Sequence, residues 1–137
     1  ITPNVSVFPT EPDGNPLEAW LASSNRLLGM LPDDLLVLPA HQSPFMGVLV
    51  RLSQIIDSHR LALANLYDLL MEPKLLPECF SCLFGREIGD NEIQMATGET
   101  VAHLNYLWHR GNIQRRINAD DRYEYQSDPE ARYVNAE

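Results

Sequence analysis

The sequence contains little cysteine and no apolar run long enough to cross a bilayer, which takes about 20 residues. Its start lacks the basic and then apolar stretch of a secretory signal peptide. Two cysteines cannot build the disulfide framework of a small secreted domain, so we expect a reducing, cytoplasmic location. The chain also does not begin with methionine, which we interpret as a sign that it is a piece of a longer protein.

Basic residues are also scarce. Ten lysines and arginines stand against 19 aspartates and glutamates, which gives a formal net charge of −9. This charge repels phosphate backbones and argues against general nucleic-acid binding. The chain has 137 residues, of which 45% are hydrophobic, so it has enough apolar material for one or two small domains with a core.

The first third of the chain predicts a strand, a helix and a second strand. Residues 5–8 are a short β-like run, and Pro16 suits the first turn of a helix that Asn15 caps and that continues to about residue 31. Residues 35–38 are consecutively apolar and are bounded by prolines, which is typical of a strand buried on both faces. These elements predict the remnant of an αβ layer, on which further elements should pack.

A long amphipathic helix is predicted over residues 46–71, followed by a shorter helix over 77–84 that ends at Gly85. The apolar positions of the long helix recur at i, i+3 and i+4 spacing, which predicts that one stripe of it is buried. The members of this stripe are Val48, Leu52, Ile55, Ile56, His59, Ala62, Leu63, Leu66 and Leu70.

The last part of the chain predicts helices and then a hairpin. Residues 87–96 predict a turn or a further helix, and Thr97 can cap a helix over 98–110. Two β-rich runs within 112–126 are joined by a polar loop, which predicts a β-hairpin. The tail, 127–137, is polar and is expected to fray. The predicted fold class is α+β and mainly α, with helices and hairpin in the order of a winged helix-turn-helix.

Four histidines are candidates for a site, and none forms a short-spaced pair at a strand end. His41 follows the predicted buried strand, at the sheet edge where ligands and metals collect, although one imidazole alone more often hydrogen-bonds to backbone. His59 lies on the apolar stripe, either as a buried histidine or, with Arg60, as a residue facing a missing catalytic domain and its cleft. His103 is expected on the exposed face of its helix, and His109 near its end, where a cation suits the dipole; neither is given a site role.

Cys79 and Cys82 form a C-x-x-C without the context of a redox or zinc site. A redox motif would follow a strand at a helix N-terminus, and zinc would require a second pair of ligands. We interpret both cysteines as small buried hydrophobic residues on one helix face.

Five stretches of the sequence carry a resemblance to a known family. They read ITPNVSVFP, NPLEAWLASSNRLL, LLVLPAHQSPF, RLSQIIDSHRLAL and ETVAHLNYLWHRGNIQRR. Together they resemble the C-terminal portion of metallo-β-lactamase-fold hydrolases over about residues 1–126. The similarity is to the glyoxalase-like and endoribonuclease-like branch, whose members append a small winged-helix domain. The resemblance implies that residues 1–43 close the catalytic domain and that 44–137 form the helical, winged-helix-like domain.

The resemblance also implies a role for His41, as the last ligand of a two-metal site that holds zinc or another divalent pair in the intact protein. The other ligands, including a His-x-His-x-Asp-His motif, would precede Ile1, so no metal is expected in this fragment. Relatives usually have glycine after this histidine, whereas Gln42 stands there in this chain.

The resulting hypothesis is the C-terminal fragment of a metal-dependent hydrolase, with zinc as the expected metal, that is inactive alone. The helical domain would wall the substrate cleft, with His59 and Arg60 as cleft candidates. The parent reaction would be attack of a metal-bound hydroxide on an acyl or phosphoryl centre. The alternative is a non-catalytic winged-helix module for protein or RNA contact. Expected partners are the missing catalytic domain and, in a possible homodimer, a second copy of the chain. A membrane is not an expected partner.

Nucleic acid is not an expected partner because the predicted wing is neutral. Over residues 99–125 the basic and acidic residues balance, and a groove-reading helix should show more Arg, Lys, Asn or Gln. The basic residues are Arg110, Arg115, Arg116 and Arg122, and the acidic ones are Glu99, Asp120, Asp121 and Glu124.

Overall fold

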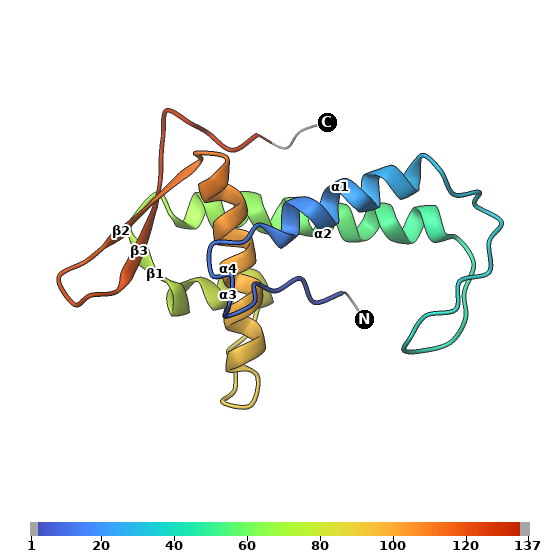
Figure 1. Ribbon diagram of the computed structural model, residues 1–137, viewed down its shortest axis with the longest axis horizontal. Coiled ribbons are helices and arrows are strands. Elements are labelled where there is room, and N and C mark those ends of the chain that lie inside the picture. The colour runs from blue at the N-terminus through green and yellow to red at the C-terminus, as the bar shows by residue number, and fades with distance from the viewer. Residues whose placement is uncertain (1–2, 135–137) are drawn as a thin grey trace.

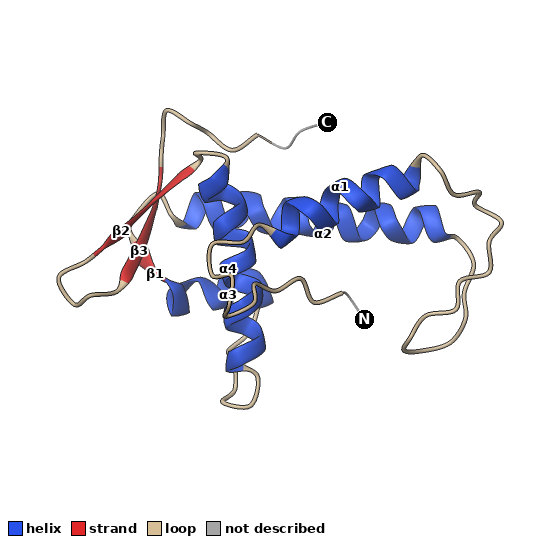
Figure 2. Ribbon diagram, in the orientation of Figure 1, coloured by secondary structure: helices blue, strands red, loops and turns tan. Residues whose placement is uncertain are grey.

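The computed structural model describes residues 3–134 and contains helices with a small sheet. Figures 1 and 2 show a pair of long helices, a third long helix that crosses them, and the sheet at one end. The predicted fold class, α+β and mainly α, is confirmed. In chain order the elements are α1 (Pro16–Leu28), α2 (Val48–Leu69), β1 (Lys74–Leu75), the 3-10 helix η1 (Leu76–Cys79), α3 (Phe80–Phe84), α4 (Ile93–His109), β2 (Ile113–Ile117) and β3 (Tyr123–Ser127).

Helix α1 begins at the residue that the sequence predicts, and helix α2 corresponds to the predicted long amphipathic helix. The Asn15 side chain accepts a hydrogen bond from the Glu18 backbone N–H at 3.4 Å and so caps α1. In α2 the stripe residues Ile56, Leu63 and Leu66 are almost fully buried, and Leu52 is half-buried. Burial of one stripe explains why this helix is stable, because packing of an amphipathic face supplies most helix stability in proteins.

The core joins all parts of the described chain. Val5 and α1 bury side chains in the same cluster as α2, α4 and the sheet, so the first residues share one core with the helices and the sheet that follow. The cluster consists of Val5, Leu17, Leu21, Ile56, Leu63, Leu66, Tyr67, Leu70, Cys79, Leu104, Tyr106, Leu107, Ile113 and Tyr125.

The sheet has the strand order β1-β3-β2 and is antiparallel throughout. Its hairpin confirms the predicted one, with Arg115 opposite Tyr125 and Ile117 opposite Tyr123. The Asn118 side chain accepts hydrogen bonds from loop N–H groups, which shapes the turn. The two-residue strand β1 was not predicted, because so short a segment has no periodicity of its own and is defined by its pairing with β3.

The predicted buried strand at residues 35–38 is absent. Val37 forms only an isolated bridge with Phe45, through N–H···O bonds of 2.8 and 3.1 Å, while Leu36 and Leu38 are 61% and 74% exposed. Residues 5–8 also form no strand, and there the Val7 N–H donates to the Gly98 carbonyl of α4. A doubly buried strand requires neighbouring strands and covering layers, which residues 3–134 do not provide at this position.

A single helix α4 replaces the two segments predicted around Thr97, which lies inside the helix and is not its cap. Glycine ordinarily weakens a helix interior, and Gly98 lies inside α4. The structure gives it a packing reason: a Cβ at Gly98 would lie 3.1 Å from the Ser6 Cβ. Glycine therefore allows the N-terminal segment to approach the helix closely.

The start of the tail is ordered, which corrects the expectation of fraying from residue 127. Ser127 donates its N–H to the Leu70 carbonyl at 2.8 Å and its hydroxyl to the Tyr67 carbonyl at 2.6 Å. The Asn112 side chain donates to the Ala131 carbonyl at 2.9 Å. These bonds tie the tail to the core, and the rest of that prediction falls on residues 135–137, outside the described part.

Candidate functional site

His41 lies in an exposed loop that connects α1 to α2 at the end of the helix pair opposite the sheet. The bridge between Val37 and Phe45 closes this loop, and Gln42 adopts a left-handed backbone with φ of 71°. Only glycine adopts such a φ without strain, which explains why a glycine fits the position after this histidine. Gln42 therefore adopts the left-handed turn conformation that favours glycine.

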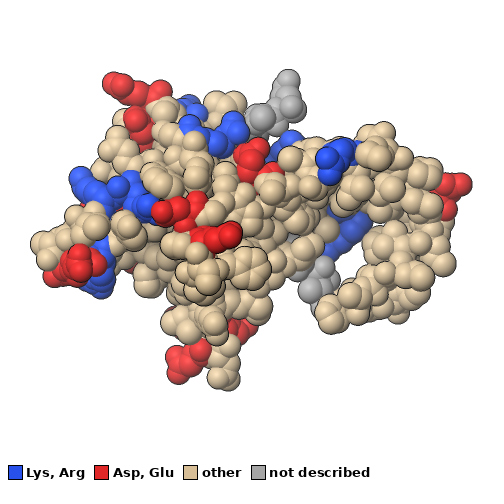
Figure 3. Space-filling view, viewed as in Figure 1, with Lys and Arg blue, Asp and Glu red and all other residues tan. Residues whose placement is uncertain are grey.

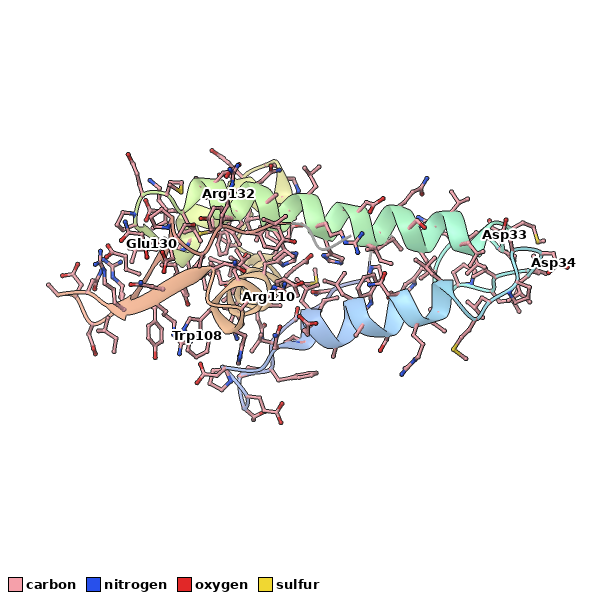
Figure 4. All side chains as sticks on the ribbon, turned by 90° about the horizontal axis from the view of Figure 1, so that it is seen from above. Asp33, Asp34, Trp108, Arg110, Glu130 and Arg132 are labelled. Atoms are coloured by element: carbon pink, nitrogen blue, oxygen red, sulfur yellow. The ribbon has the colours of Figure 1, made fainter. Side chains whose placement is uncertain are left out.

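The loop and the first turn of α2 border an open cavity of about 480 Å³ beside His41. Gly47, with φ of 86°, turns the chain into α2 so that Arg51 faces the loop. The cavity is lined by Pro39, His41, Gln42, Ser43, Pro44, Phe45 and Arg51. Figure 4 shows Asp33 and Asp34 at this end of the helix pair, far from Trp108 and Arg110.

The donors of this chain do not by themselves fit a hydrolytic metal centre. Such a centre takes three or four ligands per zinc, and a second metal takes more. Among residues 3–134 no three His, Cys, Asp or Glu side chains come together in a way that could hold a metal. His41 can supply one ligand, and any others must come from outside the described residues.

A second polar cluster is buried between α2 and α4. His59 and His103 are only 4% and 2% exposed, and His59 Nδ1 lies 3.1 Å from His103 Nε2. His103 was expected on the exposed face of its helix, and this was wrong. Helix α4 is covered by α1 and the N-terminal segment as well as by α2, so nearly all its sides are buried between Ala102 and Leu107.

The hydrogen-bond partners determine where the protons of this pair lie. His103 Nδ1 is 2.8 Å from the Glu99 carbonyl, which can only accept, so His103 Nδ1 donates. In a neutral imidazole the Nε2 of His103 is then an acceptor, and His59 Nδ1 donates to it. The remaining atom, His59 Nε2, is therefore an acceptor, and it is buried without a partner among the described residues.

Burial keeps both imidazoles neutral. Desolvation lowers the pKa of His103 to about 4, opposed by its bond to the Glu99 backbone and assisted by the neighbouring His59. Desolvation also lowers the pKa of His59. The rings of Trp20 and His59 pack edge to face, with ring centroids 5.0 Å apart. The pair is thus a neutral hydrogen-bonded unit in which His59 Nε2 is the one ring nitrogen without a partner among the described residues.

One of the two cleft candidates borders a cavity. His59 and His103 line a space of about 420 Å³ with Glu99, whose pKa burial raises. Arg60 does not line this space; it is half-buried and pairs with Asp57 at 3.6 Å. Sequence reasoning missed the role of His103, because its partner is 44 positions away in the chain.

The arginines of the hairpin region are all paired. Arg115 packs between the rings of Trp108 and Tyr123, at 4.0 and 4.4 Å from their centroids, and pairs with Asp13 at 2.8 Å. The other pairs are Arg110 with Glu18 at 3.9 Å, Arg116 with Glu124 at 3.0 Å and Arg122 with Asp120 at 3.2 Å. Figure 3 accordingly shows basic and acidic side chains next to one another over the hairpin.

The two cysteines are free and form part of the core. Cys79 is fully buried, and desolvation raises its pKa to about 12. Cys82 is half-buried against the same cluster. A thiol with so high a pKa is a poor nucleophile and a poor ligand, which agrees with the interpretation of Cys79 as a packing residue. The prediction that both cysteines are buried on one helix face is only partly met, because Cys82 is half-buried and lies in α3, whereas Cys79 lies in η1.

Comparison with known proteins agrees with the resemblance in the sequence. Residues 63–128 match the family described as metallo-beta-lactamase-like, C-terminal domain. A solved beta-lactamase domain protein from Burkholderia ambifaria is 35% identical, with a TM-score of 0.86 over 91% of this chain and 37% of that chain. A metallo-beta-lactamase family protein from Thermus thermophilus is 29% identical, with a TM-score of 0.75 over 93% of this chain and 38% of that one. No curated protein matches.

The chain thus spans less than two-fifths of the length of these two solved proteins. Within residues 3–134 no helix is long and apolar enough to cross a membrane. The matched family and the two structures agree on the part of the fold represented. This chain therefore represents a C-terminal portion of the metallo-β-lactamase fold.

Proposed function

We propose that this chain is the C-terminal part of a metal-dependent hydrolase, in which residues 1–43 complete the catalytic domain and the remainder covers its substrate cleft. His41 contributes one metal ligand, and the preceding part of the protein contributes the others. The observation that carries the proposal is the loop around His41, where an exposed imidazole stands in a turn that is closed by the Val37–Phe45 bridge and by the left-handed Gln42.

Uncovered apolar side chains around this loop support the proposal. They surround His41 in sequence and extend over the adjoining ends of α1 and α2. An exposed apolar surface of this kind is typical of an interface with another domain. The residues are Leu27, Met30, Leu35, Leu36, Leu38, Met46 and Val50. The two solved proteins are more than twice as long as this chain, which leaves room for such a domain.

The helical part is proposed to be a winged-helix-like domain used for packing. Its order of α2, β1, α3, α4 and then the β2–β3 hairpin is that of a winged helix. Its wing arginines are engaged by acidic and aromatic neighbours, so they are not free for phosphate groups. We propose that this domain walls the cleft and that His59 and Arg60, on α2 beyond the His41 loop, lie toward that cleft.

Metal content of the intact protein tests the proposal. The His41→Asn variant should lose about half of the bound metal, because one of two ions loses a ligand, and hydrolysis of ester and phosphodiester substrates should fall with it. The matched control is His109→Asn, since His109 is an exposed histidine whose ring bonds to the Asp13 carbonyl, far from this loop. Equal metal content in wild type and His41→Asn would refute the assignment of His41.

A further inference from the structure

The cavity beside His41 is lined by a basic residue that forms no ion pair within residues 3–134. Arg51 lines this cavity, and no carboxylate among the described residues lies within 4.0 Å of its guanidinium. Two other arginines of the described part, Arg26 and Arg132, also have no such partner. Both of those are exposed, whereas Arg51 is half-buried.

The unpaired guanidinium stands out against the charge of the chain. The net charge is −9, and carboxylates pair with most of the basic residues, yet no Asp or Glu of the described part lines this cavity. The first turn of α2 has no acidic residue, and its N-cap, Gly47, provides no side-chain cap, so the positive end of the helix dipole adds to the same region. Partial burial strengthens an ionic contact compared with one in open water.

We infer that this cavity binds an oxyanion, a carboxylate or phosphate group of the substrate, through the guanidinium of Arg51. A guanidinium donates two parallel N–H bonds to such a group. The amide of Gln42 and the hydroxyl of Ser43 line the same cavity and can donate further bonds, while Pro39, Pro44 and Phe45 give it apolar walls.

The role of this anion site in substrate binding rests on the proposed function, because His41 as a metal ligand would place the reacting centre next to this cavity. Arg51 would then be a specificity residue that positions an anionic substrate by a group remote from the bond that is cut. The expected substrate class is an ester, thioester or phosphodiester that carries a second, negatively charged group.

Titration of the chain with sodium phosphate and sodium acetate at constant ionic strength tests the inference. Binding is followed by NMR through the Arg51 Nε–H signal and the backbone amide N–H signals of residues 40–43, 45 and 46. We expect saturable shifts with a dissociation constant on the order of millimolar. The Arg51→Gln variant should bind at least about tenfold more weakly. The Arg51→Lys variant should retain only part of the affinity, because it keeps the positive charge but lacks the two parallel N–H donors of the guanidinium.

The matched control is Arg26→Gln. This variant removes an exposed arginine of α1 that also has no ion pair in the described part, and it should leave binding unchanged.

The relative affinities for the two anions indicate the substrate class. A preference for phosphate would identify phosphoryl-bearing substrates, and a preference for acetate would identify carboxylate-bearing ones. Shifts that do not saturate, or that are equal in wild type and Arg51→Gln, would overturn the inference. The metal content of His41→Asn does not depend on Arg51, so either proposal can fail without the other.

Discussion

The buried histidine pair predicts how stability depends on pH. The pKa of His103 is lowered from 6.5 to about 4 in the folded chain. As the pH falls below 6.5, the unfolded chain therefore binds a proton that the folded chain does not, so the free energy of unfolding decreases until the pH reaches about 4. One pKa unit corresponds to about 1.36 kcal/mol, so this residue alone should cost about 2 kcal/mol between pH 7.5 and pH 5.

Urea unfolding at these two pH values measures the effect in wild type and in His103→Asn. Asparagine retains an amide donor near the Glu99 carbonyl and does not titrate. The variant should be less stable at pH 7.5, because His59 loses its acceptor, and should lose about 2 kcal/mol less than wild type on going to pH 5. Glu99, whose pKa is raised, acts in the opposite direction, but it is present in both proteins and cancels in the difference.

The matched control is His41→Asn, which changes an exposed histidine and should keep the pH dependence of wild type. His59 also has a lowered pKa, so a smaller dependence should persist in His103→Asn. A pH dependence of stability that is the same in His103→Asn and in wild type would refute the reasoning that His103 is buried in neutral form.

Two further predictions concern the core and the hairpin. Leu63→Ala should lower the free energy of unfolding by about 2–5 kcal/mol, because Leu63 is fully buried, whereas Gln54→Ala on the exposed face should change it little; similar melting temperatures would contradict this. Fluorescence anisotropy at low salt should show no saturable binding of single-stranded RNA or duplex DNA below the non-specific range of about 10⁻⁶–10⁻⁴ M, since Arg115 and Arg116 are paired. Sub-micromolar binding that disappears in the Arg115→Ala, Arg116→Ala double variant would show instead that the hairpin recognises nucleic acid.

Local signals in the sequence were sufficient for the helices α1 and α2 and for the hairpin. The Asn15 cap, the apolar stripe of α2 and the polar turn at residues 118–121 act through neighbours a few positions away, so they can be recognised without the fold. The family resemblance likewise depended on short stretches, and the His41 turn is one of them. The same local reasoning identified Cys79 as a buried packing residue.

Other features depended on what the tertiary structure brings together. The segment 35–38 has the composition of a buried strand, but without neighbouring strands its leucines stay exposed. His103 is buried because α4 is enclosed on several sides, and Gly98 interrupts no helix because the N-terminal segment packs against it. The contact between His59 and His103, and the position of Arg51 beside His41, join residues from different elements. Sequence alone determined the elements whose stability is local, whereas burial, pairing and the shape of the cavities are properties of contacts between distant segments and were decided by the packed chain.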